Sequence, residues 1–119
     1  MFEGTPPQML ASLQRLAALP AQTLVCCGHE YTLGNAAFAQ HVDPTNAALQ
    51  RRQKEVLDMR HRSLPTVPAV LADELACNPF LRTRAAAIVD AIATRLGRMP
   101  LDEAETFAEL RRWKDGFRA

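Results

Sequence analysis

Residues 23–32 of this chain read Thr23-Leu-Val-Cys-Cys-Gly-His-Glu-Tyr-Thr32, a short apolar run followed by a polar one. Residues 24–27 predict a buried strand that ends at Gly28. Three polar or ionisable side chains, at residues 29–31, come directly after the glycine. Because ligands and catalytic groups of α/β proteins gather beyond the carboxyl ends of strands, His29 is the first candidate for a functional residue.

The rest of the chain is patterned for helices. Residues 6–19 carry apolar side chains at helical spacing, and Pro20 follows them. Spacing, capping residues and breakers predict further helices over residues 32–42, 47–62, 70–77, 83–96 and 102–114. Thr32 is the expected cap of the first of these helices, and Thr83 is the expected cap of the alanine-rich helix that ends near residue 96. Two prolines predict an extended loop over residues 63–69. The strand at residues 24–27 therefore has no evident ladder partner, which indicates that the chain is the C-terminal part of a larger α/β protein.

Composition narrows the class of protein. The chain has 119 residues, enough for one domain, and its formal net charge is +1, so no net field favours nucleic acid or a membrane surface. No apolar run is long enough to span a bilayer. Its cysteines are Cys26, Cys27 and Cys77; an odd number with two adjacent predicts small buried hydrophobes in a reducing compartment, by default the cytoplasm.

The polar residues after the strand allow more than one interpretation. A single histidine at residue 29 is weak evidence for a metal, because a metal site needs several converging ligands, and His41 and His61 have no ligand-like spacing to it. Glu30 is either a general base or an exposed carboxylate. Tyr31 either donates a hydrogen bond to a substrate oxygen or packs as a half-buried aromatic.

A second cluster of functional candidates lies near the C-terminus, in Arg111-Arg-Trp-Lys-Asp115. On a helix, Arg111 and Lys114 are three residues apart and share a face, where two cations can hold a carboxylate or a phosphate. The alternative is that they only complement the helix dipole. Arg82 and Arg84 could add to an anion pocket or be surface charge.

Several motifs, in order, resemble one known family, hydroxyacylglutathione hydrolase (glyoxalase II). They are Phe2-Glu-Gly-Thr5, Cys27-Gly-His-Glu-Tyr-Thr32, Pro65-Thr-Val-Pro68, Asn78-Pro-Phe-Leu-Arg82 and Arg111-Arg-Trp-Lys-Asp115. The resemblance implies a mostly α-helical C-terminal part of an α/β fold of the αββα metallo-β-lactamase type. Residues 1–31 are then a remnant of the metallo-β-lactamase-type domain, with one strand of its second sheet, and residues 32–119 are a helical glutathione-binding domain.

The resemblance also implies an activity and site residues. Members hydrolyse the thioester of S-lactoylglutathione to lactate and glutathione, in the removal of methylglyoxal, with two divalent metal ions, zinc and/or iron. His29 matches a metal ligand and Tyr31 a residue near glutathione. Arg111 and Lys114 match the basic pair that binds the glycine carboxylate of glutathione. For Arg82 only a structural role is implied, and Phe2 stands where some members have a tyrosine.

The main departure of the chain from the family concerns the metal ligands. The family's Thr-His-x-His-x-Asp-His motif, a further histidine and the bridging aspartate are absent, so the metal ions are not expected to be retained. The chain is then a fragment, a truncated gene product, or half of a split enzyme that is inactive without an N-terminal metal-binding half. The alternatives are a non-catalytic glutathione-binding module and an inactive remnant that aggregates through its unpaired strand.

Overall fold

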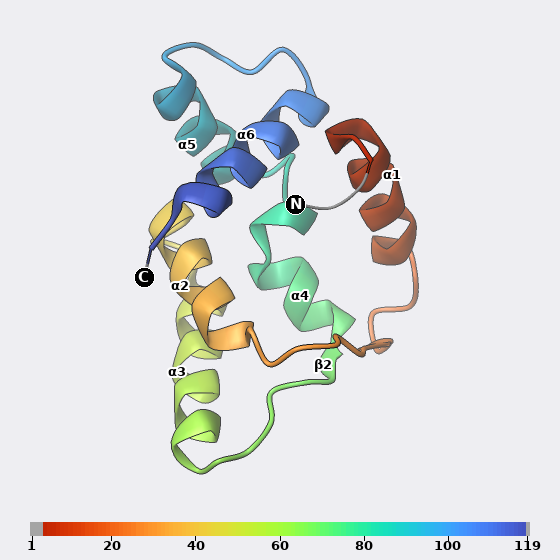
Figure 1. The fold of residues 1–119 in the computed structure, drawn as a ribbon, viewed down its shortest axis with the longest axis vertical. Coiled ribbons are helices and arrows are strands. Elements are labelled where there is room, and N and C mark those ends of the chain that lie inside the picture. Colours follow the sequence, from red (N-terminus) through yellow and green to blue (C-terminus); the bar gives the residue numbers. More distant parts are fainter. Residues whose placement is uncertain (1–3, 119) are drawn as a thin grey trace. The chain divides into compact units, whose positions relative to one another are not determined.

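The computed structural model describes residues 4–118, and these are mostly helical (Figure 1). The elements in chain order are α1 (Pro6–Ala17), β1 (Leu24–Val25), α2 (Thr32–Val42), α3 (Ala47–His61), β2 (Ala69–Val70), α4 (Leu71–Cys77), the 3₁₀ helix η1 (Pro79–Leu81), α5 (Ala86–Leu96) and α6 (Glu103–Gly116). The predicted helices are thus confirmed to within a few residues at their ends. Among residues 4–118, no helix is both long and apolar enough to cross a membrane.

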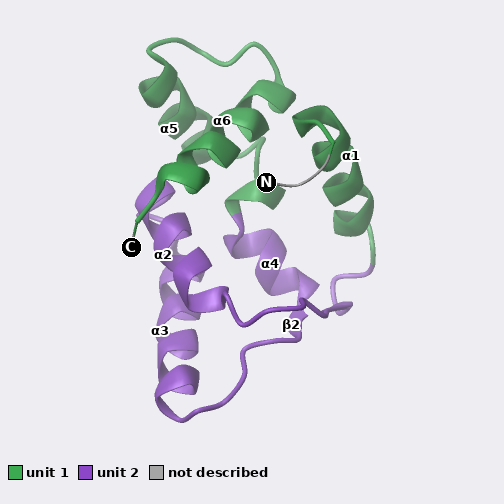
Figure 2. Ribbon diagram, viewed as in Figure 1, with its two compact units in different colours: residues 1–19, 79–118 green, residues 20–78, 119 purple. Residues whose placement is uncertain are grey.

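The chain forms two compact units (Figure 2). Among the described residues, unit 1 consists of residues 4–19 and 79–118, and unit 2 consists of residues 20–78. The division at residue 31 that the family resemblance implies is of a different kind, because it concerns the domains of a longer protein, and it stays a prediction.

In unit 1, α6 packs against α1, α5 and η1. The core consists mainly of Leu10 from α1, Ile88 and Ile92 from α5, and Phe107 and Leu110 from α6, all buried. Local sequence explains the helix ends. Thr5 and Gln8 form a reciprocal capping box at the start of α1, and Gly97 ends α5 in the left-handed conformation, with φ 74°.

Glu103 is the polar centre of unit 1. Its carboxylate accepts hydrogen bonds from Thr83 Oγ1 at 2.7 Å, Arg84 Nε at 2.9 Å and Gln14 Nε2 at 3.1 Å, so it joins α6 to α1 and to the segment before α5. The prediction that Thr83 caps α5 is therefore wrong, since Ala85 is the N-cap residue and the Thr83 hydroxyl is used by Glu103. Arg84 is a surface charge in an ion pair.

In unit 2, α2 packs on α3 and α3 packs on α4; Figure 1 shows α2 and α3 side by side. The buried apolar residues come chiefly from α2 and α3. They are Ala36, Phe38, Ala39, Val42, Leu49, Val56, Ala69 and Leu71. The charged face of α3 stays exposed, as its sequence indicates.

The strand prediction needs correction. The strand covers only residues 24–25, and Leu24 is 58% exposed rather than buried. It also has a partner, because it pairs antiparallel with β2 in the register Leu24↔Val70 and Val25↔Ala69. Because of their two prolines, residues 63–69 are predicted to be a loop. The two residues after Pro68, Ala69 and Val70, are nevertheless extended, and unlike proline they have N–H groups that can join a ladder. Within the described residues the strand is thus paired, so aggregation through an unpaired strand is no longer expected.

The cysteines also differ from the prediction. Cys26 and Cys27 are exposed and Cys77 is partly exposed, so none of them is a buried core residue. The ladder ends at Val25, and the chain leaves the sheet before it reaches either of the adjacent cysteines.

Asn46 offers a test of how unit 2 is held together. Its Oδ1 accepts from Ala48 N at 3.1 Å and Leu49 N at 3.3 Å, and its Nδ2 donates to Ala76 O at 2.8 Å. We expect Asn46→Ala to lower the free energy of unfolding by about 1–2 kcal/mol, because an N-cap is lost. Asn46→Asp keeps the cap acceptor and loses only the donor, so its loss should be smaller. Urea unfolding followed by circular dichroism measures both, and equal losses would contradict the capping account.

Candidate functional site

The segment between β1 and α2 carries the first pair of candidate residues. His29 and Tyr31 stack with their ring centroids 4.8 Å apart and their planes only 5° from parallel. Both are exposed, Tyr31 by 63%. Of the two interpretations of Tyr31, the half-buried aromatic is wrong. The segment instead presents an imidazole and a phenol side by side at the surface of unit 2.

Tyr31 occupies a position for which its side chain is poorly suited. It is the N-cap residue of α2, and its side chain makes no capping hydrogen bond. Asn, Asp, Ser and Thr are preferred at N-caps because a short side-chain oxygen can accept from the first helical N–H groups. The expected cap, Thr32, lies one residue too late and is the first residue of the helix. A tyrosine at this position is not explained by helix formation.

Glu30 has a structural role that neither sequence interpretation covered. Its carboxylate accepts from Thr66 N at 2.5 Å and from Thr66 Oγ1 at 2.6 Å. These hydrogen bonds hold the pKa of Glu30 below its usual value, and the positive charge of Arg60 adds to the effect. The carboxylate therefore stays ionised and engaged, and it is unsuited to the role of a free general base. Its partner lies 36 residues along the chain, beyond the reach of local pattern analysis.

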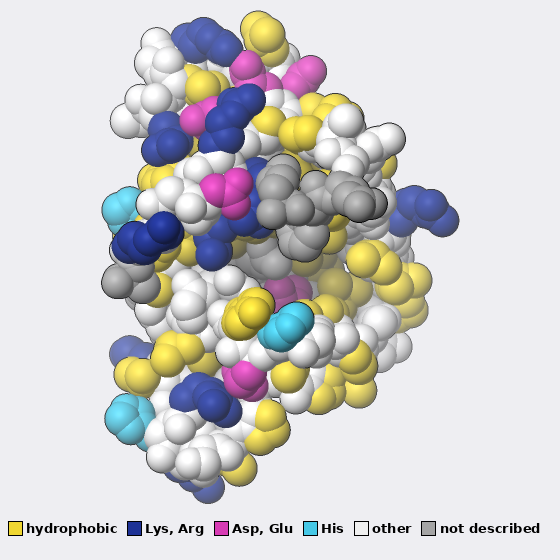
Figure 3. Space-filling view, in the orientation of Figure 1, with side chains coloured by type: hydrophobic (Ala, Val, Ile, Leu, Met, Phe, Trp, Pro, Cys, Tyr) yellow, Lys and Arg dark blue, Asp and Glu magenta, His cyan; other side chains and the backbone are white. Residues whose placement is uncertain are grey.

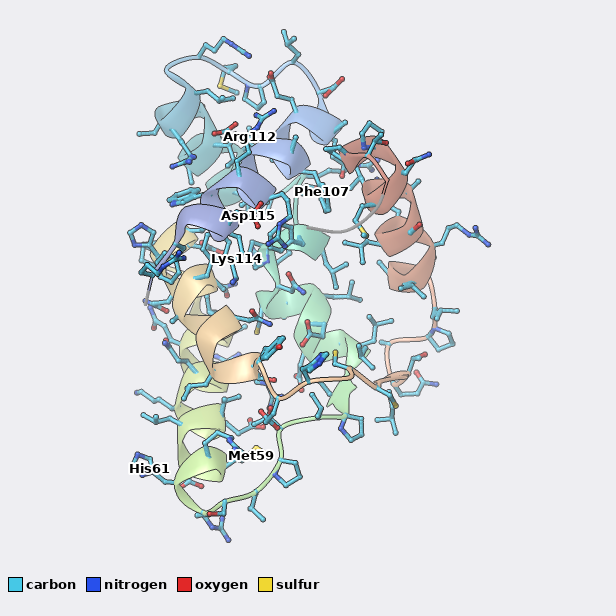
Figure 4. All side chains as sticks on the ribbon, in the orientation of Figure 1. Met59, His61, Phe107, Arg112, Lys114 and Asp115 are labelled. Carbon is cyan, nitrogen blue, oxygen red and sulfur yellow. The ribbon has the colours of Figure 1, made fainter. Side chains whose placement is uncertain are left out.

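The described residues do not fit a metal ion by themselves. Among residues 4–118, no group of three or more His, Cys, Asp or Glu side chains is placed to hold one. His61, at the end of α3 (Figure 4), belongs to no such group. Partial burial of the thiol and the negative charge of Glu74 raise the pKa of Cys27, which disfavours the thiolate that a metal ligand or nucleophile requires.

The second pair of candidates lies on α6 in unit 1. Arg111 donates from Nε to Asp115 Oδ1 at 3.0 Å, and its Nη2 donates to the same oxygen. The Arg111 guanidinium holds the pKa of Asp115 below its usual value and lies 5.8 Å from the centre of the Phe80 ring. Lys114 is partly exposed on the same helix, next to Asp115 in Figure 4. The face is basic, but one of its cations already holds a carboxylate.

The neighbouring arginine of the motif has a different environment. Arg112 Nη1 donates to Glu109 Oε2 at 2.7 Å, and Arg95 Nε donates to Glu109 Oε1 at 3.0 Å. Arg95 also lies over the Trp113 ring, 5.1 Å from its centre. The space-filling view of α5 and α6 shows such basic and acidic side chains next to each other (Figure 3). Arg112 thus forms an ion pair with Glu109 from an exposed position, and Glu109 is a buried carboxylate that the sequence pattern did not identify.

The predicted site residues therefore form two pairs, each within one unit. His29 and Tyr31 are in contact in unit 2, and Arg111 and Lys114 share the C-terminal part of α6 in unit 1. Arg82 contributes its backbone to the turn around η1, through Arg82 N to Pro79 O and Ala85 N to Arg82 O. Phe2 lies outside the described residues.

Comparison with known proteins gives a consistent result. Residues 30–117 match the family model described as "Hydroxyacylglutathione hydrolase C-terminus". The chain is 66% identical over 119 residues to a protein of Xanthomonas axonopodis pv. citri (strain 306) named hydroxyacylglutathione hydrolase, and it covers 47% of that protein. A protein of the same name from Xylella fastidiosa (strain 9a5c) is 66% identical over 117 residues, 98% of this chain and 45% of the relative. The chain spans about half the length of these curated relatives.

The unusual N-cap gives a prediction about Tyr31. Replacing it in Tyr31→Asp supplies a capping oxygen and an acidic charge at the N-terminus of α2, and should raise the free energy of unfolding by about 1 kcal/mol. Urea unfolding measures this, and Tyr31→Leu, which removes the ring without adding a cap, is the control. If Tyr31→Asp were no more stable than Tyr31→Leu, the added carboxylate would not act as a cap; the difference between Tyr31→Leu and the wild type measures what the ring contributes.

Proposed function

This chain belongs to the hydroxyacylglutathione hydrolase C-terminus family, and from that membership we propose that it is the glutathione-binding part of a thioester hydrolase acting on S-lactoylglutathione. The observation that carries the proposal is the 66% identity over the whole chain to proteins named for this activity. The products are lactate and glutathione, in the removal of methylglyoxal. We place the protein in the cytoplasm, and we divide it into a remnant of the metallo-β-lactamase-type domain (residues 1–31) and the helical domain (residues 32–119).

The proposed reaction needs a metal centre that the described residues cannot form alone. A bound pair of divalent ions, zinc and/or iron, supplies a hydroxide at neutral pH and polarises the thioester carbonyl. We assign one ligand, His29, to this chain. The remaining ligands would come from the part of the relatives that this chain does not span. The stacking of His29 on Tyr31 supports the assignment, because it restricts the rotation of an imidazole that is otherwise exposed.

Recognition of glutathione is the contribution that we assign to this chain's own residues. Glutathione carries two carboxylates, and we propose that Arg111 and Lys114 bind the one on its glycine through charge-assisted hydrogen bonds. The support for this role is that both cations lie in the C-terminal part of α6, three residues apart. In the structure the Arg111 guanidinium holds an Asp115 carboxylate oxygen through two donors. A substrate carboxylate would compete with Asp115 for the same group. We assign the Tyr31 hydroxyl to a contact with the glutathione moiety.

A second candidate function is glutathione binding without catalysis. It is favoured by the absence of a metal-ligand group among residues 4–118, together with the basic face on α6. The two functions make different predictions for hydrolysis and share the prediction for binding.

The catalytic proposal is tested by supplying the missing part. The N-terminal part of the Xanthomonas axonopodis relative is fused ahead of this chain, and S-lactoylglutathione hydrolysis and metal content are measured. We expect turnover from the fusion and none from the chain alone, and His29→Ala in the fusion should reduce both turnover and bound metal. His61→Ala, an exposed histidine on α3, is the matched control. Turnover by the chain alone would contradict the proposal, and so would a fusion in which His29→Ala leaves turnover and bound metal unchanged.

The binding role is tested on the chain by calorimetric titration with glutathione. Arg111→Ala and Lys114→Ala should each weaken binding by about tenfold, since a charge-assisted hydrogen bond is worth roughly 1.5 kcal/mol or more. Asp115→Asn should tighten binding because it removes the competing carboxylate. Arg112→Ala is the control, since Arg112 is adjacent on the same helix but does not share the face of Arg111 and Lys114. Equal affinity in all variants would rule out the basic pair as the carboxylate site.

A further inference from the structure

Residues 21–31 and 66–72 run antiparallel for longer than the strands alone. Leu71 N donates to Thr23 O and Ala72 N donates to Ala21 O, each at 2.8 Å, ahead of the two-residue ladder. Past the ladder the two segments separate and meet again where Glu30 binds Thr66. Residues 26–29 therefore form a small loop fastened at both ends, by the ladder at Val25 and by Glu30.

The contact between Glu30 and Thr66 consists of two short hydrogen bonds. Both carboxylate oxygens of Glu30 are used, one by the backbone N–H of Thr66 and one by its hydroxyl, at 2.5 and 2.6 Å. Thr66 is only 2% exposed. Hydrogen bonds to a charged acceptor are about twice as strong as neutral ones, and a buried donor that loses its acceptor is costly. Glu30 is thus held at a fixed point of unit 2.

The segment that holds Glu30 is itself fixed to α3. Arg60 Nη1 donates to Leu64 O at 3.0 Å and lies 4.0 Å from Glu30 Oε1. The guanidinium links the C-terminal end of α3 to Glu30 and to the backbone two residues before Thr66. The loop after β1 is therefore held by a helix as well as by the strand ladder.

Glu30 lies between the two rings in the sequence. Its carboxylate is bound to Thr66, while the rings of His29 and Tyr31 lie against each other. The backbone bends at residues 28 and 29, so the rings meet across a curved stretch of chain. Because Glu30 is the one residue between His29 and Tyr31, fixing its side chain restricts the backbone from which both rings extend.

We infer that Glu30 and Thr66 are positioning residues, whose paired hydrogen bonds hold His29 and Tyr31 in their stacked arrangement. The importance of this arrangement for catalysis rests on the proposed function, whereas the stacking itself is seen in the structure. The Pro65-Thr-Val-Pro68 motif thereby has a specific task, since it presents the Thr66 N–H and hydroxyl to Glu30. Neither residue touches the reacting atoms in this role.

The test uses NMR of the whole chain, which has a single tyrosine. Stacking on Tyr31 shifts the His29 ring protons, and Tyr31→Leu defines their position without the neighbouring ring. We expect Glu30→Ala and Thr66→Val to move the His29 signals to the Tyr31→Leu position, and Thr66→Ser, which keeps both donors, to restore the wild-type shift. Thr83→Val removes a comparable hydroxyl–carboxylate bond in unit 1 and should leave His29 unchanged.

Two outcomes would overturn the inference. One is a wild-type His29 shift in Glu30→Ala and Thr66→Val, with circular dichroism showing that both are folded. The other is loss of the shift in Thr83→Val as well, which would make it a sign of general loosening. Because the readout needs neither metal nor substrate, a negative result is distinct from failure of the fusion to hydrolyse S-lactoylglutathione. In an active fusion, Glu30→Ala should lower kcat and bound metal, and Thr66→Ser should retain both.

Discussion

The antiparallel contact between residues 21–25 and 69–72 is the constraint on which unit 2 depends. It joins segments more than forty residues apart (24 to 70) and closes a loop that contains α2 and α3. Closing a long loop costs conformational entropy that grows only slowly with its length, so a few well-formed contacts can offset it. The helices inside the loop then pack on each other through Phe38, Leu49 and Val56. The exposed segment after β1 begins at one end of that ladder, and the Glu30–Thr66 hydrogen bonds hold its other end.

Glutamate carboxylates accept hydrogen bonds that connect separate segments in both units. Glu30 and Glu103 each join segments distant in sequence, and Glu109 is held between two arginines. Arg98 donates to both oxygens of Glu105, and Leu101 N also donates to this carboxylate, so these bonds connect the loop between α5 and α6 to α6. The same bonds lower the pKa of Glu105 to about 2. Because each of these pKa values is lower in the folded chain, the stabilisation is present above the ordinary carboxyl pKa and is lost as the pH falls through the folded value.

The sequence predicted what depends on neighbours along the chain. Periodicity, prolines and Gly97 located the helices, because those signals act within one or two turns. A two-residue strand gives no period to detect, so β2 was not recognised beside its prolines. The partners of Glu30 and Glu103 lie far along the chain, and capping preferences alone assigned Thr83 and Thr32 to roles that tertiary contacts override. His29 and Tyr31 were selected by their place after a predicted strand, and Arg111 and Lys114 by their helical spacing. The family motifs then gave each a role, but their contacts could come only from the structure.

The residues that break local rules point in the same direction as the family resemblance. An exposed tyrosine at an N-cap forgoes about 1 kcal/mol of capping, and an exposed imidazole stacked on it adds little to a core. Sequences retain such conflicts mainly where function requires them. The Arg111–Asp115 pair is different, because an ion pair four residues apart on a helix needs no functional explanation. The physical case for a site is therefore stronger for the His29–Tyr31 segment than for the basic face of α6, which depends on the substrate's carboxylate to give it a purpose.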